Sequence, residues 1–301
     1  MAKSKYSAVI IGAGKIAWSV TGALVKNRIK ITSVISRNPD SARLLARKFK
    51  INHCSSDIRS VPPEADLYLL TVPDGKIKSV ADKISGMSSD FSGKMFLHFS
   101  GVESSEILSS LAEKGSIVGS VHIMQTFPLR EAINISGCNA AVESFDKKHS
   151  KQVLNFARTI KLKPFLISSE EKTLYHLSGV LASNFTAGNF YMADKISGGN
   201  YNTAKLLSGI AEKTLKNITV KGAVNSLSGP VERGDYKTIK RHIEALQIAL
   251  KTKKGTGKLL ISYISQSLVL LELVKEKNGK LSPAHKKIND LLKEELQKTI
   301  S

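Results

Sequence analysis

Residues 7–17 constrain the possible fold of this chain more than any other stretch. They read Ser-Ala-Val-Ile-Ile-Gly-Ala-Gly-Lys-Ile-Ala, so a β-branched run is followed by Gly12-x-Gly14-x-x-Ala17 and then by apolar residues at helical spacing. A strand, a glycine turn and a helix in this order are the context of a dinucleotide-binding fingerprint. There, Gly12 allows the tight turn, Gly14 lets the backbone approach a pyrophosphate, and Ala17 permits close helix–strand packing. The alternative interpretation is a glycine turn that binds nothing.

The helix after this turn would present free backbone N–H groups and the positive end of its dipole to a phosphate. We therefore predict that the turn binds the cofactor. The predicted contacts come from five consecutive residues: Gly12, Ala13, Gly14, Lys15 and Ile16.

The end of the second expected strand, residues 30–35, indicates which dinucleotide binds. Enzymes selective for NAD usually carry an acidic residue there, which bonds the ribose 2′-hydroxyl. This chain has Ser36, Arg37 and Asn38 instead, and Asp40 is expected to cap the helix that follows. A hydroxyl and a planar guanidinium suit a 2′-phosphate, so we predict NADP, contacted by these three residues. The alternative is that Arg37 is a solvated loop charge.

Strands and helices alternate over the first half of the chain. Strands are expected at 9–11, 30–35, 50–54, 67–72, 95–99, 117–121, 140–142 and 164–167. This alternation predicts an α/β fold with a Rossmann-type, doubly wound and largely parallel sheet, and we assign residues 1–169 to an NAD(P)-binding domain. Ligands of such sheets bind outside the carboxyl ends of the strands, so we expect further cofactor contacts from Val72, Pro73 and Ser100.

From residue 170 onward the sequence shows helical periodicity and little strand character. Helices are expected at 174–196, 203–217, 236–250, 257–275 and 282–299, with a stop at Gly198-Gly199-Asn200. We assign residues 170–301 to an all-helical domain for substrate binding and dimerisation. The helix at 174–196 has apolar residues on more than one face, which favours burial or a subunit interface.

Three histidines, an asparagine and an arginine are candidates for chemistry. His98 and His122 close strands at the carboxyl edge of the sheet, and His176 shares a helix face with Asn184. Histidine titrates near neutrality, so we predict catalytic roles for His176, Asn184 and His122. His98 and Arg233 are predicted to contact the substrate, although His98 could instead be a structural histidine.

The composition narrows the class of protein. The chain has 301 residues, 42% of them hydrophobic, and a formal net charge of +20. Its lysines are scattered and no motif with interleaved aromatic residues accompanies them, so we expect no nucleic-acid partner. Two cysteines without metal-binding spacing indicate a reduced, cytoplasmic setting and no metal site. No apolar run reaches transmembrane length and no signal peptide is expected.

Several segments carry a family resemblance. They are Gly12-x-Gly14-x-x-Ala17, Thr71-Val72-Pro73-Asp74, His98-Phe99-Ser100-Gly101, Val121-His122-x-x-Gln125-Thr126-Phe127, His176 with Ala182-Ser183-Asn184-Phe185, and Gly229-Pro230-x-x-Arg233-Gly234-Asp235. Together they resemble the NADP oxidoreductases that join a Rossmann-like N-terminal domain to a C-terminal domain of unknown function of the DUF2520 type. This family is similar to pyrroline-5-carboxylate reductase, ketopantoate reductase and the β-hydroxyacid dehydrogenases.

The resemblance implies a Rossmann fold, NADP and a cleft between the domains, but no particular substrate. In the related enzymes a helical second domain closes over the nicotinamide and commonly dimerises, so a homodimer is expected. Two departures stand out. Ile123 stands where the family usually has proline, and no Lys-x-x-x-Asn pair of the β-hydroxyacid dehydrogenase type is found on the first long helix. A lysine general acid is therefore not evident.

Two functions remain open from the sequence. The first is an NADP-dependent oxidoreductase, in which NADPH donates a hydride to a small carbonyl or imine substrate while His176 or His122 supplies a proton. The alternative is a non-catalytic NADP-binding sensor or scaffold, for which the lack of an evident lysine or tyrosine donor is an argument, but the oxidoreductase is our preferred interpretation. Substrate-dependent oxidation of NADPH would separate the two.

Overall fold

A computed structural model describes residues 6–197, 202–252 and 257–300. Within them the strands are β1 Ser7–Ile11, β2 Lys30–Ile35, β3 Cys54–Ser55, β4 Leu67–Leu70, β5 Met95–His98, β6 Ile117–Ile123, β7 Asn139–Ser144 and β8 Lys163–Leu166. They form one sheet in the order β3-β2-β1-β4-β5-β6-β7-β8, in which β6 and β7 pair antiparallel and the other neighbours pair parallel. The predicted α/β class with a Rossmann-type sheet is confirmed.

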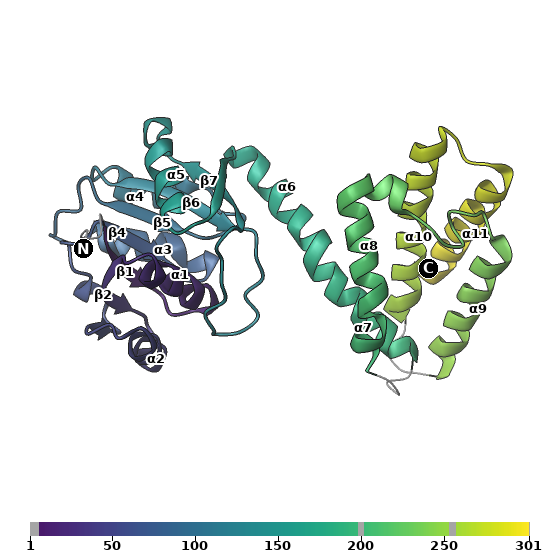
Figure 1. Ribbon diagram of the computed structural model, residues 1–301, viewed down its shortest axis with the longest axis horizontal. Helices are drawn as coiled ribbons and strands as arrows, with labels where there is room; N and C mark the ends of the chain where they lie inside the picture. The colour runs from purple at the N-terminus through teal and green to yellow at the C-terminus, as the bar shows by residue number, and fades with distance from the viewer. Residues whose placement is uncertain (1–5, 198–201, 253–256, 301) are drawn as a thin grey trace. The chain divides into compact units, whose positions relative to one another are not determined.

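Helices cover both faces of this sheet (Figure 1). They are α1 Lys15–Lys26, α2 Pro39–Phe49, α3 Ile77–Ser85, α4 Ser109–Ala112 and α5 Ser150–Thr159. Residues of α1, α2 and α5 bury one face, and residues of α3 and α4 bury the other. Along β1, Ala8 and Ile10 belong to the first cluster and Val9 and Ile11 to the second. This alternation is typical of a strand buried on both faces, which explains the unbroken apolar run in the sequence.

Two local predictions near α2 are wrong. Strand β3 begins at Cys54 and not at residue 50, because Lys50 ends α2 in the left-handed conformation with a φ of 55°. The helix is capped by Asn38 and not by Asp40. The Asn38 side chain accepts a hydrogen bond from the Ser41 N–H at 2.8 Å, whereas Asp40 pairs with Arg43 at 2.5 Å. The proline between the two candidates fits the first helical position, which places the cap before it.

The remaining elements of the described chain are helices, as predicted, although the first begins at Ser169 and not at residue 174, and the one expected to end at residue 217 extends to Ser226. These elements are α6 Ser169–Gly179, a π-helical turn Val180–Asn184, α7 Phe185–Ser197, α8 Thr203–Ser226, α9 Tyr236–Thr252, α10 Gly257–Asn278 and α11 Pro283–Ile300. The expected stop at 198–200 lies outside the described residues. Ile239, Ile264 and Ile288, from α9, α10 and α11, are fully buried in a core of their own.

The chain divides into two compact units, one ending at Ser183 and the other beginning at Asn184. This division falls inside the π-helical turn, C-terminal to the predicted boundary between residues 169 and 170. It lies there because Lys172 and His176 of α6 contact strands of the sheet unit. Helical turns of this type are frequent at functional sites.

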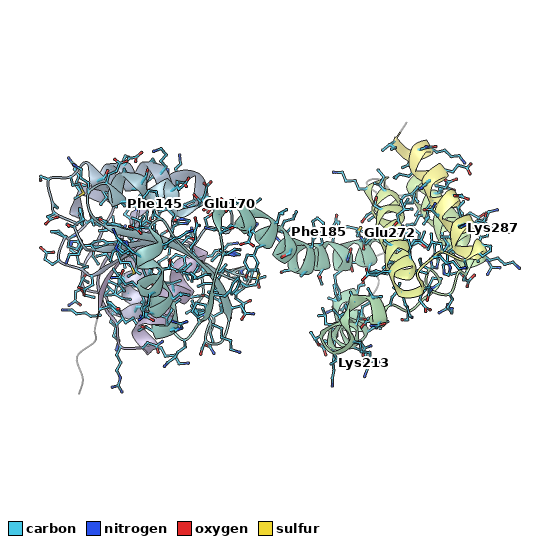
Figure 2. The ribbon with its side chains drawn as sticks, turned by 90° about the horizontal axis from the view of Figure 1, so that it is seen from above. Phe145, Glu170, Phe185, Lys213, Glu272 and Lys287 are labelled. Atoms are coloured by element: carbon cyan, nitrogen blue, oxygen red, sulfur yellow. The ribbon has the colours of Figure 1, made fainter. Side chains whose placement is uncertain are left out.

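Side chains project from the helices of the second unit, among them those of the labelled Lys213 and Lys287 (Figure 2). Lys213 on α8 and Lys287 on α11 are both exposed and lie on different helices.

Candidate functional site

The glycine turn brings the end of β1 against the end of β4. Gly12 has a φ of +103°, and a Cβ at this position would lie 2.7 Å from the carbonyl carbon and oxygen of Thr71. The Thr71 hydroxyl donates to the Gly12 carbonyl oxygen at 2.9 Å and so holds the turn in place. Only glycine combines this backbone conformation with this close approach.

The N-terminus of α1 follows directly and is open to an anion. Gly14 is its N-cap and provides no side-chain hydrogen bond, and the first turn of the helix contains no acidic residue. Ala13 is buried and Lys15 is exposed. The first backbone N–H groups of α1 have no partner within the helix, so this end can bind a phosphate. The five consecutive residues of the glycine turn that are predicted to bind the cofactor, 12–16, all lie here.

The other predicted cofactor residues follow the neighbouring parallel strands. Ser36 is half-buried and Arg37 is exposed at the end of β2, while Val72 is half-buried beyond β4. Ser100 is buried beyond β5, where its hydroxyl accepts from the N–H groups of Val102 at 3.2 Å and Glu103 at 3.0 Å. Since carboxyl ends of parallel strands meet at one edge, the structure gathers these positions on a single side of the sheet.

His176 and His122 are brought together at the same edge. The His176 ring lies on Gly101, where a Cβ would come within 2.9 Å of the ring atoms Cγ and Nε2. Its centroid is 5.4 Å from that of His122 in β6, and the Tyr175 ring is 5.9 Å from His122. Nδ1 of His122 is buried and has no hydrogen-bond partner among the described residues. An unsatisfied buried polar atom in such a place is a candidate for contact with a ligand or water.

A buried ion pair lies one helical turn before His176. The Lys172 side chain is fully buried, and its Nζ donates to Ser120 Oγ at 2.7 Å, to Glu143 Oε2 at 3.1 Å and to the carbonyl oxygen of Glu103. Three acceptors account for all three N–H bonds of an ammonium group. Lys172 is therefore fully engaged within the protein.

Glu143 in β7 is equally well satisfied. Its Oε1 accepts from Ser105 N and Oγ, both at 3.1 Å, and from Ser169 Oγ at 2.7 Å, while Oε2 also accepts from Ser120 Oγ at 3.2 Å. Burial alone would raise the pKa of Glu143, but the Lys172 charge and the hydrogen bonds hold it below its usual value. The ionised pair ties α6 to β6 and β7.

Burial keeps two histidines of this region neutral at pH 7. It lowers the pKa of His122 to about 4, with smaller contributions from His176 and Lys172. Burial, with Lys172, lowers the pKa of His98 to about 3. His98 is fully buried, and its ring nitrogens contact the Ser104 carbonyl oxygen at 3.2 Å and the Ser100 N–H at 3.3 Å. These bonds favour the structural interpretation of His98 over the predicted substrate contact.

Two predicted site residues belong to the second unit. Asn184 is exposed at the end of the π-helical turn, and Arg233 is exposed in the loop before α9. Their roles in catalysis and substrate binding stay predictions.

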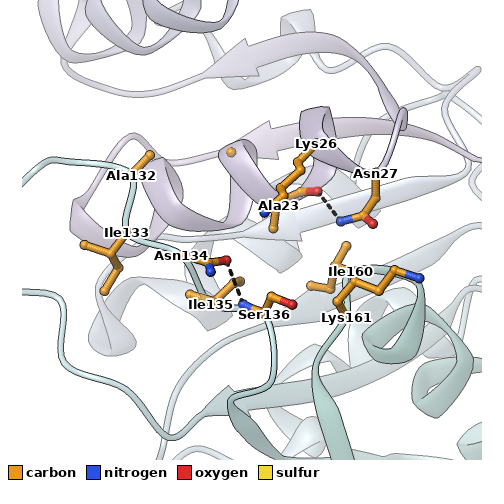
Figure 3. A pocket seen from close by; sticks show the side chains of 11 residues that line it. Ala23, Lys26, Asn27, Ala132, Ile133, Asn134, Ile135, Ser136, Ile160 and Lys161 are labelled. Carbon is orange, nitrogen blue, oxygen red and sulfur yellow. Dashed lines mark hydrogen bonds between the residues drawn. The ribbon is translucent and has the colours of Figure 1, made fainter.

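A separate cavity of about 230 Å³ lies beside the C-terminal half of α1 (Figure 3). Its lining includes Ala23, Lys26 and Asn27 from that helix and its cap, together with residues 132–136. These positions are at the other end of α1 from Gly14. The cavity therefore lies apart from the glycine turn.

The sequence interpretation missed Lys172 and Glu143. Two signals could have revealed them. Lys172 stands four residues before His176, so the two share a helix face. Glu143 directly follows residues 140–142, which were expected to form a strand, and a charged residue in a buried strand requires a partner.

Comparison with known protein families assigns both halves of the chain. Residues 1–123 match a Rossmann-like domain, and residues 138–258 match the domain of unknown function DUF2520. The chain joins a Rossmann-like domain to a DUF2520 domain. The resemblance drawn from the sequence motifs is thereby confirmed.

Solved structures extend this likeness over most of the chain. A protein from Bacteroides fragilis assigned as an NADP oxidoreductase has a TM-score of 0.71 at 20% identity and covers 91% of this chain and 98% of its own. A reductive aminase from Aspergillus terreus, solved with NADPH, has a TM-score of 0.60 at 11% identity, with 98% and 95% covered. A pyrroline-5-carboxylate reductase from Coxiella burnetii has a TM-score of 0.54 at 14% identity, with 97% and 98% covered. At these identities the likeness shows the fold.

No curated protein matches the chain. Among the described residues, none of the helices has the length and apolar character needed to cross a membrane.

Proposed function

We propose that this Rossmann–DUF2520 chain is an NADP-dependent oxidoreductase that reduces a small carbonyl or imine substrate. The observation that carries the proposal is the turn at Gly12, which admits no side chain and leads into an α1 N-terminus with no capping side chain. This arrangement suits a pyrophosphate, whose oxygens accept from backbone N–H groups. The solved reductive aminase and pyrroline-5-carboxylate reductase of similar fold support the reaction class.

NADP is the preferred cofactor in this proposal. Ser36 and Arg37 follow β2, where an NAD-selective enzyme usually carries an acidic residue. The exposed guanidinium of Arg37 offers several donors to a 2′-phosphate. When bound, the nicotinamide would supply the hydride.

Among the groups at the sheet edge, His176 is the best proton donor. His122 is neutral at pH 7 because its pKa is lowered to about 4, so it carries no proton to give as an imidazolium. Lys172 is fully buried, and all three of its N–H groups donate hydrogen bonds to acceptors within the protein. His176 is half-buried beside Gly101, at the end of β5. The imidazole of a histidine in this position can donate a proton to a developing alkoxide or amine.

Replacement of His176 by alanine should separate turnover from cofactor binding. We expect turnover to fall by about 100-fold or more, since general acids contribute that much, while the Kd for NADPH changes by less than about threefold. The measurement is NADPH oxidation at 340 nm with small carbonyl compounds, with and without primary amines, beside a fluorescence titration of NADPH. His149→Ala, at the start of α5, is the matched control.

Unchanged turnover in His176→Ala would remove His176 from this role. A wild-type chain that binds NADPH but oxidises it with none of these compounds would instead support the sensor or scaffold alternative.

We also propose a small-molecule substrate that Asn184 and Arg233 orient. Their amide and guanidinium groups suit a polar or anionic substrate.

A homodimer is the proposed assembly. Helix α8 is kinked at Gly222, which has a φ of 77°, and Thr203 is its one buried residue. Leu206, Ile210 and Val220 on it are 68%, 70% and 74% exposed. Helices in proteins are stabilised mainly by the packing of an apolar face, and a second copy of the chain would supply that packing here.

Light scattering should show this dimer at micromolar concentration, with an interface on the order of 2,000 Å² or more. The variant Ile210→Lys/Val220→Lys should shift it towards monomer, because two ammonium groups would become buried. Lys213→Ala on the same helix is the control. A wild-type chain that is monomeric throughout would refute the assembly.

A further inference from the structure

The segment between β6 and β7, residues 124–138, crosses α1 and reaches α2. It is fastened to α1 by Ser19, whose hydroxyl donates to the Glu131 carbonyl oxygen at 3.3 Å and accepts from the Ile133 N–H at 3.2 Å. Ala132 packs beside Gly22, where a Cβ would lie 3.3 Å from the Ala132 Cβ. These contacts hold the backbone on the C-terminal side of Arg130 against the helix.

Arg130 is thereby placed at the first turn of α2. Its Nη1 donates to Ser41 Oγ at 3.2 Å, and the Ser41 N–H in turn donates to the side chain of Asn38 at 2.8 Å. Asn38 directly follows Ser36 and Arg37, so a guanidinium from a distant segment lies beside the end of β2.

The charge of Arg130 is uncompensated in the described part of the chain. The nearest acid in sequence to Ser41 is Asp40, which pairs with Arg43 at 2.5 Å, and Arg130 forms no ion pair with any described residue. Its side chain is exposed. The Arg130 guanidinium is thus held near the turn that carries Arg37, and no carboxylate pairs with it among the described residues. Two guanidinium groups in this arrangement suit an anion with several oxygens.

We propose that Arg130 is a specificity-determining residue that, with Arg37, binds the 2′-phosphate of NADP. This inference rests on the proposed function and extends it to a residue outside the dinucleotide fingerprint. The phosphate carries charge and three acceptor oxygens that the 2′-hydroxyl of NAD lacks. A contact of this kind therefore strengthens NADPH binding and leaves NADH binding nearly unchanged.

The test compares the Kd values of NADPH and NADH, measured by fluorescence titration at one fixed ionic strength. The variants are Arg130→Ala, Arg130→Lys, Arg37→Ala and the control Arg158→Ala, an exposed arginine of α5 with a single side-chain bond to Asn155. We expect Arg130→Ala to weaken NADPH about tenfold and NADH less than twofold. Arg130→Lys should recover part of the lost NADPH affinity, because lysine keeps the positive charge but lacks the several N–H donors of the guanidinium.

Other outcomes overturn the inference. An equal loss of affinity for both dinucleotides, or no loss, would mean that Arg130 only holds residues 124–138 against α2. If Arg37→Ala discriminates between the cofactors and Arg130→Ala does not, the proposed function stands and this inference fails. If the wild-type chain binds neither dinucleotide, the proposed function itself fails.

Discussion

Lys172→Met is expected to destabilise the sheet unit by about 3–5 kcal/mol, because it leaves the Glu143 carboxylate buried without its counter-charge. Glu143 is 5% exposed and its remaining donors are the hydroxyls and backbone of three serines, which do not neutralise a full charge. Urea unfolding at pH 7 measures the effect. Trp18, the one tryptophan of the chain, reports on this unit, since its ring lies 6.3 Å from that of Phe49.

The matched variants separate charge from packing. Lys172→Met/Glu143→Gln should recover most of the lost stability, because replacing both charged partners removes the uncompensated carboxylate. Lys78→Met removes an exposed lysine paired with Asp82 and should change stability far less. A Lys172→Met variant no less stable than Lys78→Met would show that the buried pair does not hold α6 on the sheet.

Gly12→Ala is expected to weaken NADPH binding by about 100-fold or more. A methyl group at this position would lie 2.7 Å from the Thr71 backbone, and a φ of +103° is strained for alanine. The turn must therefore move away from β4, which takes the N–H groups of α1 out of position. A fluorescence titration of NADPH measures the change, and Trp18 fluorescence reports whether the unit remains folded.

Gly75→Ala is the control for this substitution. Gly75 follows the end of β4 in the neighbouring turn, and a Cβ there would have no atom within 4 Å. It should bind NADPH like the wild type. Equal affinity of Gly12→Ala and the wild type would mean that the glycine turn is not the cofactor site.

Much of the first unit could be predicted because its signals are local. The β-branched run before Gly12 predicts a buried strand, and the small residues after it predict the turn and the helix. The helical second half could likewise be predicted from periodicity. Predicted boundaries were wrong where one local residue decided them: Lys50 ends α2 through its left-handed backbone conformation, and the side chain of Asn38 caps its start.

The candidate site could be predicted only in part, because its polar contacts join residues far apart in the chain. The pairing of His122 with His176 followed from strand ends and a helix face, although nothing in the sequence gives their 5.4 Å separation. Lys172 was missed because its partner Glu143 lies on another element, and a lysine on a helix is ordinarily exposed. An ion pair between residues on two distant elements produces no periodic pattern in the sequence.

The most direct test of the account is a crystal structure of the chain with NADPH. We predict that the pyrophosphate accepts hydrogen bonds from backbone N–H groups of residues 12–16 and that nicotinamide C4 lies beside Gly101. His176 should then reach the substrate position directly or through one water. A dinucleotide bound away from the glycine turn, or a His176 ring more than about 10 Å from C4 with the site closed, would contradict the account.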